Sequence, residues 1–91
     1  MLTNAVRCKV EGDPVPAIDE VSERLNDSGD QILVDLSSVG RIHPSAVAAL
    51  DRLARAAEDR GIRIVLEGVS VEVYRVLKLV KLAARFSFGG M

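Results

Sequence analysis

Aromatic side chains and cysteine are almost missing from this sequence. Tyr74, Phe86 and Phe88 are the only aromatic residues among 91, there is no tryptophan, and Cys8 is the single cysteine. One cysteine cannot form a disulfide within the chain, and a free thiol among alternating apolar residues usually packs as a small hydrophobe. We therefore expect a core of Val, Leu, Ile and Ala, and a reducing, cytoplasmic setting.

Long apolar runs and a strong net charge are also missing. No stretch reaches the roughly 18 uninterrupted apolar residues of a membrane span, and the N-terminus lacks the basic and apolar segments of a secretory signal. Lys and Arg number 12 and Asp and Glu number 13, so the net charge of −1 gives no overall attraction to nucleic acid or to an anionic membrane. The charge is unevenly spread, because residues 1–30 carry seven acids and three bases and residues 61–91 carry two acids and five bases. Any electrostatic interaction surface should be local.

Predicted strands and helices alternate along the chain. Residues 5–10 alternate apolar and charged side chains, which is typical of an edge or near-edge strand with one face in solvent. The run 31–36 is short, apolar and β-branched, which favours a strand buried on both faces, and 62–66 is the third strand. The tail at 86–91 either adds an edge strand or frays.

Capping signals open the predicted helices. Asp13-Pro14, His43-Pro44 and Ser70 each precede an amphipathic stretch, and Gly61 ends the second one. Strands and helices that alternate at these lengths predict a single α/β domain over residues 1–91. Its order is β-α-β-α-β-α, with a small, mostly parallel sheet and right-handed crossover helices.

The centre of the chain resembles a STAS domain. The resemblance rests on Ile32-Leu-Val-Asp-Leu-Ser-Ser-Val39 and Ile42-His-Pro-Ser-Ala-Val47, and the segment from Gly68 to Leu79 also fits the family pattern. The STAS family includes bacterial anti-sigma factor antagonists and the cytoplasmic tails of SulP anion transporters. The resemblance covers roughly residues 5–86 and implies a fold like that of the anti-sigma factor antagonist SpoIIAA.

The chain departs from the family where partner kinases act. In the phosphorylated STAS proteins the modified hydroxyl directly follows an Asp at the start of a helix, but these two positions here hold His43 and Pro44, and the family's Gly is Ala46. Ser45 keeps the family's second hydroxyl. A phosphate near a helix N-terminus is favoured by the free N–H groups and the helix dipole, so Ser45 is the candidate phosphorylation site. The alternative is that Ser45 is an ordinary polar residue of the first turn.

The resemblance implies that a protein partner binds the loop and helix between Ser38 and Arg52. On the outer side of this helix we place Ala48, Ala49 and Ala56, and small side chains there would let a partner backbone approach closely. The alternative is that alanine is simply a good helix former. The predicted partner-binding residues are Ser38, His43, Pro44, Ser45, Ala48, Ala49 and Arg52.

Cations gather on one side of the last predicted helix. Arg75, Lys78, Lys81 and Arg85 fall within an arc of ~120° at 100° per residue. This arc is either a solvated basic face or a docking surface for an acidic protein patch or lipid headgroups, with Arg75, Lys78 and Lys81 as the docking residues. Lys81 occupies a position at which many STAS sequences turn at a glycine, which predicts that the helix breaks before Arg85.

Catalysis and bound groups have little support in the sequence. His43 and Ser45 are the only base and hydroxyl that suggest nucleophilic catalysis, and they lack both a Gly-x-Ser-x-Gly elbow and a second His. One Cys and one His in different elements do not make a metal site, and single glycines in turns do not make a phosphate cradle. We therefore predict that the protein is not an enzyme and has no cofactor or metal.

Three classes of function follow from these observations. The first is a bacterial signalling module in transcription regulation that binds an anti-sigma factor, a GHKL-type kinase or a signalling scaffold, without insertion into a membrane. The second is a STAS subunit of a lipid-transport ATPase complex. The third is nucleic-acid binding by the basic residues, which the near-neutral charge and scarce aromatics disfavour.

Overall fold

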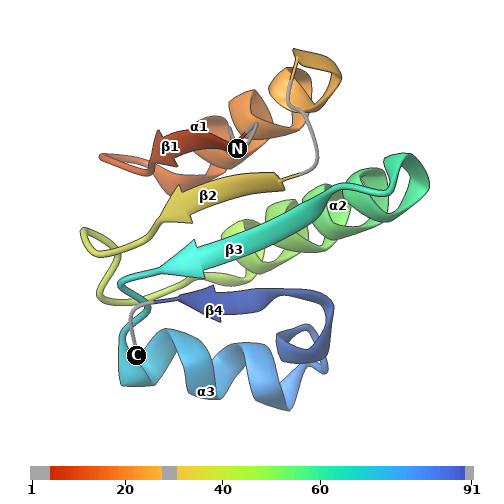
Figure 1. The fold of residues 1–91 in the computed structure, drawn as a ribbon. Coiled ribbons are helices and arrows are strands. Elements are labelled where there is room, and N and C mark those ends of the chain that lie inside the picture. The colour runs from red at the N-terminus through yellow and green to blue at the C-terminus, as the bar shows by residue number, and fades with distance from the viewer. Residues whose placement is uncertain (1–4, 28–30, 90–91) are drawn as a thin grey trace.

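The structure, a computed structural model, describes residues 5–27 and 31–89, in which strands and helices alternate (Figure 1). The strands are β1 (Ala5–Lys9), β2 (Gln31–Asp35), β3 (Arg63–Glu67) and β4 (Ser87–Gly89). The α-helices are α1 (Pro14–Glu23), α2 (Pro44–Arg60) and α3 (Val71–Leu79), and the short 3-10 helices are η1 (Arg24–Asp27) and η2 (Ala83–Arg85). The predicted α/β class is confirmed.

The described strands form one parallel sheet in the order β1-β2-β3-β4. Each crossover therefore moves one strand further in the same direction, and right-handed crossovers of this kind place their helices on the same face of the sheet. The predicted tail at 86–91 contributes the edge strand β4, and its last two residues lie outside the described part of the chain.

Side chains from α1, α2 and α3 share one core with the sheet. Ile18 of α1, Leu50 of α2 and Leu77 of α3 are almost completely buried, and they belong to the same cluster as Ile32 and Leu66 of the strands. Burial of these aliphatic side chains is the main driving force that holds the helices on the sheet. The arrangement leaves the other face of the sheet without a helix among the described residues.

This open face corrects the prediction for β2. Ile32 and Val34 point toward the helices and are fully buried, whereas Leu33 between them is only half-buried. The apolar run therefore does not mean that both faces of the strand are covered. The expectation of burial on both faces was wrong, because every crossover turns to the same side.

The helix ends follow the capping signals in the sequence. The Asp13 carboxylate accepts a hydrogen bond from the Val15 N–H at 3.1 Å, and the Ser70 hydroxyl accepts one from the Val73 N–H at 3.2 Å. Gly61 ends α2 in the left-handed conformation with a φ of 67°. The predicted N-caps of α1 and α3 and the predicted C-cap of α2 are therefore confirmed.

The last helix is shorter than the cationic arc predicted for it. α3 ends at Leu79, and Lys81 then adopts a φ of 65°, which turns the chain into η2. The predicted break before Arg85 is confirmed. Consequently Arg75 and Lys78 lie on α3 itself, whereas Lys81 lies in the turn after it. No helix in residues 5–27 and 31–89 is long and apolar enough to cross a membrane.

Candidate partner-binding surface

The loop between β2 and α2 lies at the carboxyl edge of the sheet and is held there by hydrogen bonds to the β3–α3 segment. The Leu36 N–H donates to the Glu67 carbonyl at 2.8 Å, which continues the pairing of β2 with β3. The Ser70 hydroxyl donates to the Gly40 carbonyl at 3.2 Å. The loop is therefore tied both to the neighbouring strand and to the N-terminus of α3.

Gly68 brings the β3–α3 connection into direct contact with this loop. A Cβ atom at Gly68 would lie 2.7 Å from the Cβ of Ser37, closer than side chains approach one another. The φ of Gly68 is also positive, at 67°, where other residues are strained. Glycine is thus required at this position for two independent reasons.

Asp35 ends β2 and organises the first turn of the loop. Its carboxylate accepts a hydrogen bond from the Ser37 N–H at 2.8 Å. Hydrogen bonds from the Ser37 hydroxyl and from the Ser37 N–H lower the pKa of Asp35 below its ordinary value, and the positive charges of Lys9 and Arg7 lower it further, against a smaller effect of burial. The base of the loop therefore carries a negative charge at neutral pH.

Six of the seven predicted partner-binding residues are exposed around the start and outer side of α2. We call this set the α2 N-terminal surface. It consists of Ser38, His43, Pro44, Ser45, Ala48 and Arg52.

His43 is the N-cap residue of α2, but it caps the helix through its backbone. Its carbonyl accepts hydrogen bonds from the N–H groups of Ala46 and Val47 at 2.9 and 3.0 Å, and its side chain makes no capping hydrogen bond. The first turn, which contains Ser45, has no acidic residue. The N-terminal end of the helix dipole is therefore not neutralised by a carboxylate of that turn, which favours an added anion there.

Ala49 is the predicted surface residue that the structure corrects. Its side chain is completely buried, and Ala56 is half-buried, whereas Ala48 is exposed. α1 packs against α2 and covers this side of the helix. A helical wheel places Ala49 near the edge of the apolar arc of α2. Whether such a residue is buried or exposed depends on where α1 packs. Ala49 is therefore a core residue and takes no part in the surface.

Arg52 marks the far end of the surface and is fixed by an ion pair. One of its guanidinium nitrogens lies 3.2 Å from a carboxylate oxygen of Asp19 on α1. Both side chains are about half exposed. The pair links the two helices at the surface and orients the Arg52 side chain toward α1.

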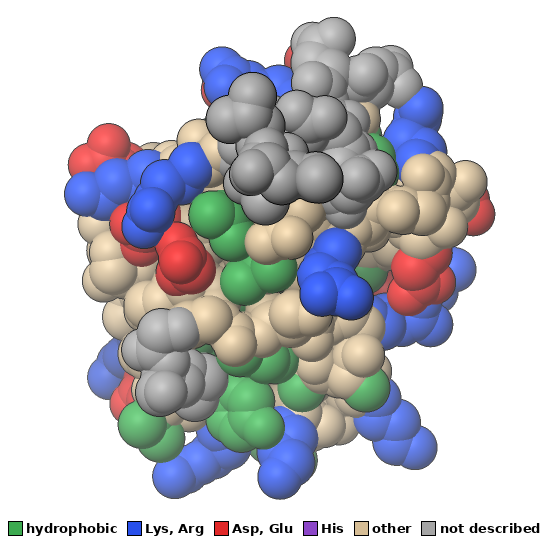
Figure 2. Space-filling model, viewed as in Figure 1, with side chains coloured by type: hydrophobic (Ala, Val, Ile, Leu, Met, Phe, Trp, Pro, Cys, Tyr) green, Lys and Arg blue, Asp and Glu red, His purple; other side chains and the backbone are tan. Residues whose placement is uncertain are grey.

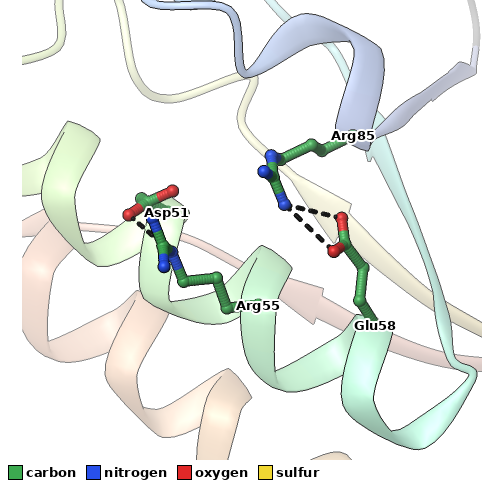
Figure 3. Close-up of polar contacts among 4 residues, drawn as sticks. All are labelled: Asp51, Arg55, Glu58 and Arg85. Atoms are coloured by element: carbon green, nitrogen blue, oxygen red, sulfur yellow. Dashed lines mark hydrogen bonds and ion pairs between the residues drawn. The ribbon is translucent and has the colours of Figure 1, made fainter.

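Arg85 does not join the other C-terminal cations. Its guanidinium donates to both carboxylate oxygens of Glu58 on α2, at 2.9 and 3.0 Å, as Figure 3 shows. The prediction that Arg85 shares a cationic arc with the other C-terminal cations is therefore wrong. Its ion pair instead links η2 to α2. Arg55, also drawn in Figure 3, pairs with Asp51 one turn away on the outer side of α2 at 3.1 Å.

The described residues offer no arrangement for a metal ion. Among them, no group of three or more His, Cys, Asp and Glu side chains is placed to hold one. The structure also shows two exposed residues that sequence reasoning missed, Val71 and Leu79, which lie on the same helix as Arg75 and Lys78. The sequence could have indicated their exposure, because at 100° per residue both lie away from the buried face of α3 that contains Val73 and Leu77.

The fold and the sequence together identify the family. The sequence family described as "Mlab, STAS domain" matches residues 6–86, which is most of the chain. The chain belongs to the STAS domain family. No curated protein matches its sequence significantly.

Solved structures share the fold at low sequence identity. The NMR structure of the protein TM1081 has a TM-score of 0.77 at 17% identity, covering 97% of this chain and 75% of that chain. A crystal structure of tm1081 from Thermotoga maritima, described there as a proposed anti-sigma factor antagonist, has a TM-score of 0.70 at 20% identity, covering 97% and 74%. A sulfate transporter family protein from Wolinella succinogenes has a TM-score of 0.78 at 17% identity, covering 100% and 83%. These similarities show that the fold is shared.

Proposed function

We propose that this STAS domain is a non-catalytic module that binds a regulatory protein partner through the α2 N-terminal surface, in the manner of an anti-sigma factor antagonist. The partner would be an anti-sigma factor, a GHKL-type kinase or a signalling scaffold. Family membership and the similarity to a proposed anti-sigma factor antagonist support this function. It would place the protein in bacterial transcription regulation.

The observation that carries the proposal is the exposed corner at the start of α2. His43, Pro44 and Ser45 are exposed together where the loop enters the helix, and the loop behind them is held by the Ser70 and Gly68 contacts. A surface that is ordered before binding loses less conformational entropy when a partner docks. The small Ala48 on the next turn lets a partner backbone approach the helix closely.

Ser45 is the residue through which this surface could be regulated. In the correspondence that the resemblance implies, His43 and Pro44 occupy the positions of the family's Asp and modified hydroxyl, and a proline has no hydroxyl to accept a phosphate. Ser45 is exposed and lies in a first turn without acidic residues. A phosphate there would add a charge of about −1.5 to −2 to the centre of the proposed interface. We infer that modification of Ser45 would switch partner binding.

A second candidate function is that of a STAS subunit in a lipid-transport ATPase complex. It is supported by the occurrence of the same fold in a sulfate transporter family protein. This function would also use a protein interface and no chemistry. The two candidates differ in the partner, which would be a nucleotide-binding ATPase subunit in the second case.

An affinity capture experiment from the native cell tests both candidates. The bait is the wild type or the variant Ala48→Arg, with Ala84→Arg as the matched control, because Ala84 is an exposed alanine on η2 outside the surface. We expect a regulatory kinase or anti-sigma factor, identified by mass spectrometry, to be bound by the wild type and by Ala84→Arg but not by Ala48→Arg. Equal capture by all three proteins would contradict the proposed surface. An ATPase subunit as the partner would establish the second candidate.

The switch is tested with two further variants at one position. Ser45→Asp adds a negative charge, whereas Ser45→Ala removes the hydroxyl and adds none. Loss of the partner with Ser45→Asp alone supports regulation at Ser45. Capture by both variants at the wild-type level would indicate constitutive binding.

A further inference from the structure

The outward side of α3 exposes apolar side chains that the core does not use. Val71 is 72% exposed, Leu79 is 77% exposed and Val80 is 47% exposed. Within the described part of the chain, these are the large hydrophobic side chains that stand out as exposed. Val71 and Leu79 share the outward side of α3, whereas Val80, directly after the helix, does not. The helix is otherwise well packed, because Val73 and Leu77 on its opposite side are completely buried.

Positive charges lie on the same side. At 100° per residue, Val71, Arg75, Lys78 and Leu79 fall within an arc of about 100°. Lys81 follows in the turn after the helix. Figure 2 shows Lys and Arg side chains along the lower edge of the molecule with hydrophobic side chains between them, where Figure 1 places α3. We call the set the α3 face, and it consists of Val71, Arg75, Lys78, Leu79 and Lys81.

An apolar hollow adjoins the α3 face. It is lined by Tyr74, Ala83, Ala84 and Phe88 together with Lys78 and Lys81. The rings of Tyr74 and Phe88 meet edge to face with their centroids 5.1 Å apart, and the Lys78 ammonium lies 6.0 Å from the Tyr74 centroid. A tyrosine ring beside lysines is typical of surfaces that contact the headgroup region of a bilayer.

We propose that the α3 face binds the anionic surface of a lipid bilayer. Arg75, Lys78 and Lys81 would lie among the lipid phosphates, while Leu79 and its apolar neighbours enter the headgroup layer. Each basic residue close to an anionic leaflet strengthens binding by about fivefold. The contact is peripheral and reversible, and it is separate from the protein-binding function proposed for the α2 N-terminal surface.

The distribution of charge along the sheet supports this orientation. The N-terminal third of the sequence carries an excess of acids and the C-terminal third an excess of bases. Because the strands follow one another in order across the sheet, α1 and α3 lie at opposite edges (Figure 1). Four strands at about 4.8 Å spacing span about 14 Å across the sheet, and charges separated by more than about 8 Å are largely screened at physiological salt. With the α3 face on the bilayer, the acidic α1 would be too distant to be repelled strongly.

The size of the α3 face favours a bilayer over an acidic protein. A helix of nine residues is about 14 Å long, and at about 10 Å wide its face covers on the order of 140 Å². A stable protein interface buries about 800 Å² on each partner and is depleted in lysine. A flat bilayer has no such minimum area, because several weak charge contacts and one or two inserted side chains add up.

Sedimentation with lipid vesicles tests the proposal. The full chain is mixed with vesicles of phosphatidylcholine alone or of phosphatidylcholine with phosphatidylglycerol. We expect binding only to the vesicles that contain phosphatidylglycerol, and release by added salt. Lys78→Glu should weaken binding about thirtyfold, because the charge changes by two units at about fivefold each. Leu79→Ser should weaken binding without changing its salt dependence.

Arg55→Glu is the matched control, since it reverses one exposed helix cation on the outer side of α2 and gives the same net charge. Its binding should remain within about twofold of the wild type. Absence of wild-type binding to phosphatidylglycerol vesicles, or an equal loss with Lys78→Glu and Arg55→Glu, would overturn the proposal. The proposal would also be overturned if Lys78→Glu abolished capture of the protein partner and the wild type did not bind vesicles. The α3 face would then belong to the protein interface. Circular dichroism of each variant shows that the fold is kept.

Discussion

Ser70 makes two hydrogen bonds with its one hydroxyl, and together they join α3 to the loop before α2. The oxygen accepts from the Val73 N–H at 3.2 Å and the hydroxyl donates to the Gly40 carbonyl, also at 3.2 Å. The residue is therefore both an N-cap and a link between two loops that are distant in the sequence. Few side chains can do both, because the second bond needs a donor.

Replacement of Ser70 separates these two roles. Ser70→Ala loses the cap and the link, so the free energy of unfolding should fall by about 1 to 2 kcal/mol. Ser70→Asp keeps the cap but cannot donate a hydrogen bond to the Gly40 carbonyl. Its free energy of unfolding should therefore fall by less than that of Ser70→Ala. Ser70→Thr, the control, keeps the hydroxyl and should remain close to the wild type. Urea denaturation measures all three, and an unchanged midpoint for Ser70→Ala would show that neither bond stabilises the fold.

A second prediction concerns the contact of Gly68 with Ser37. Gly68→Ala places a Cβ within 2.7 Å of the Ser37 Cβ and 3.0 Å of its Cα, at a positive φ. Backbone atoms cannot move aside as a flexible side chain would, so we expect a loss of about 2 to 4 kcal/mol in the free energy of unfolding.

Gly12→Ala is the matched control for Gly68→Ala. Gly12 has a φ of 68°, but an added Cβ meets nothing within 4 Å. Its loss should be only about 1 kcal/mol, from the left-handed conformation alone. Similar losses for the two variants in thermal or urea denaturation would contradict the tight contact between the loops.

Much of this fold could be predicted because its signals are local. Pro14, Pro44 and Ser70 mark helix starts, and Gly61 marks a helix end, each through the conformation or hydrogen bond of one residue. The strands were recognisable from short apolar runs, and their alternation with helices predicted a parallel sheet. Nothing in these signals depends on how the helices finally pack.

The parts that could not be predicted depend on that packing. Ala49 is buried because α1 lies on its side of α2, and no residue of α2 itself carries that information. Leu33 is half-buried because the crossovers leave one face of the sheet open. Arg85 lies outside the cationic arc because the chain turns at Lys81, and this turn places Arg85 beside Glu58. Each error has its cause in the arrangement of whole elements.

The depressed pKa of Asp35 predicts how the stability depends on pH. A carboxyl group with a lower pKa in the folded state stabilises the fold above its unfolded pKa, which is near 3.8, and this contribution is lost as the pH falls through the lower folded-state value. Asp35→Asn cannot titrate. The wild type should therefore be more stable than Asp35→Asn at neutral pH, and the difference should shrink below pH 3.8.

Urea midpoints of the two proteins at neutral and acid pH measure this effect. Asp59→Asn serves as a control, because Asp59 is an exposed residue near the end of α2. A difference between wild type and Asp35→Asn that stays constant with pH would show that the Ser37 hydrogen bonds do not depend on the charge of Asp35.

The last prediction concerns the two ion pairs of Figure 3, which differ in geometry. Arg85 and Glu58 join separate elements through two hydrogen bonds, with side chains 38% and 54% exposed. Arg55 and Asp51 lie one turn apart on a single helix and share one hydrogen bond. The Nη1 atom of Arg85 donates both hydrogen bonds, and Arg85 is less exposed than Arg55, so the coupling of Arg85 with Glu58 should be the larger.

Double-mutant cycles with Arg85→Gln and Glu58→Gln, and with Arg55→Gln and Asp51→Asn, measure the two couplings separately. We expect about 0.5 to 1 kcal/mol for Arg85 with Glu58, and about 0.3 to 0.5 kcal/mol for Arg55 with Asp51. Added salt should reduce the second coupling more, because that pair is more exposed at its arginine. Equal couplings would mean that η2 is held against α2 by its apolar contacts, and that Arg85 contributes no more than an ordinary surface charge.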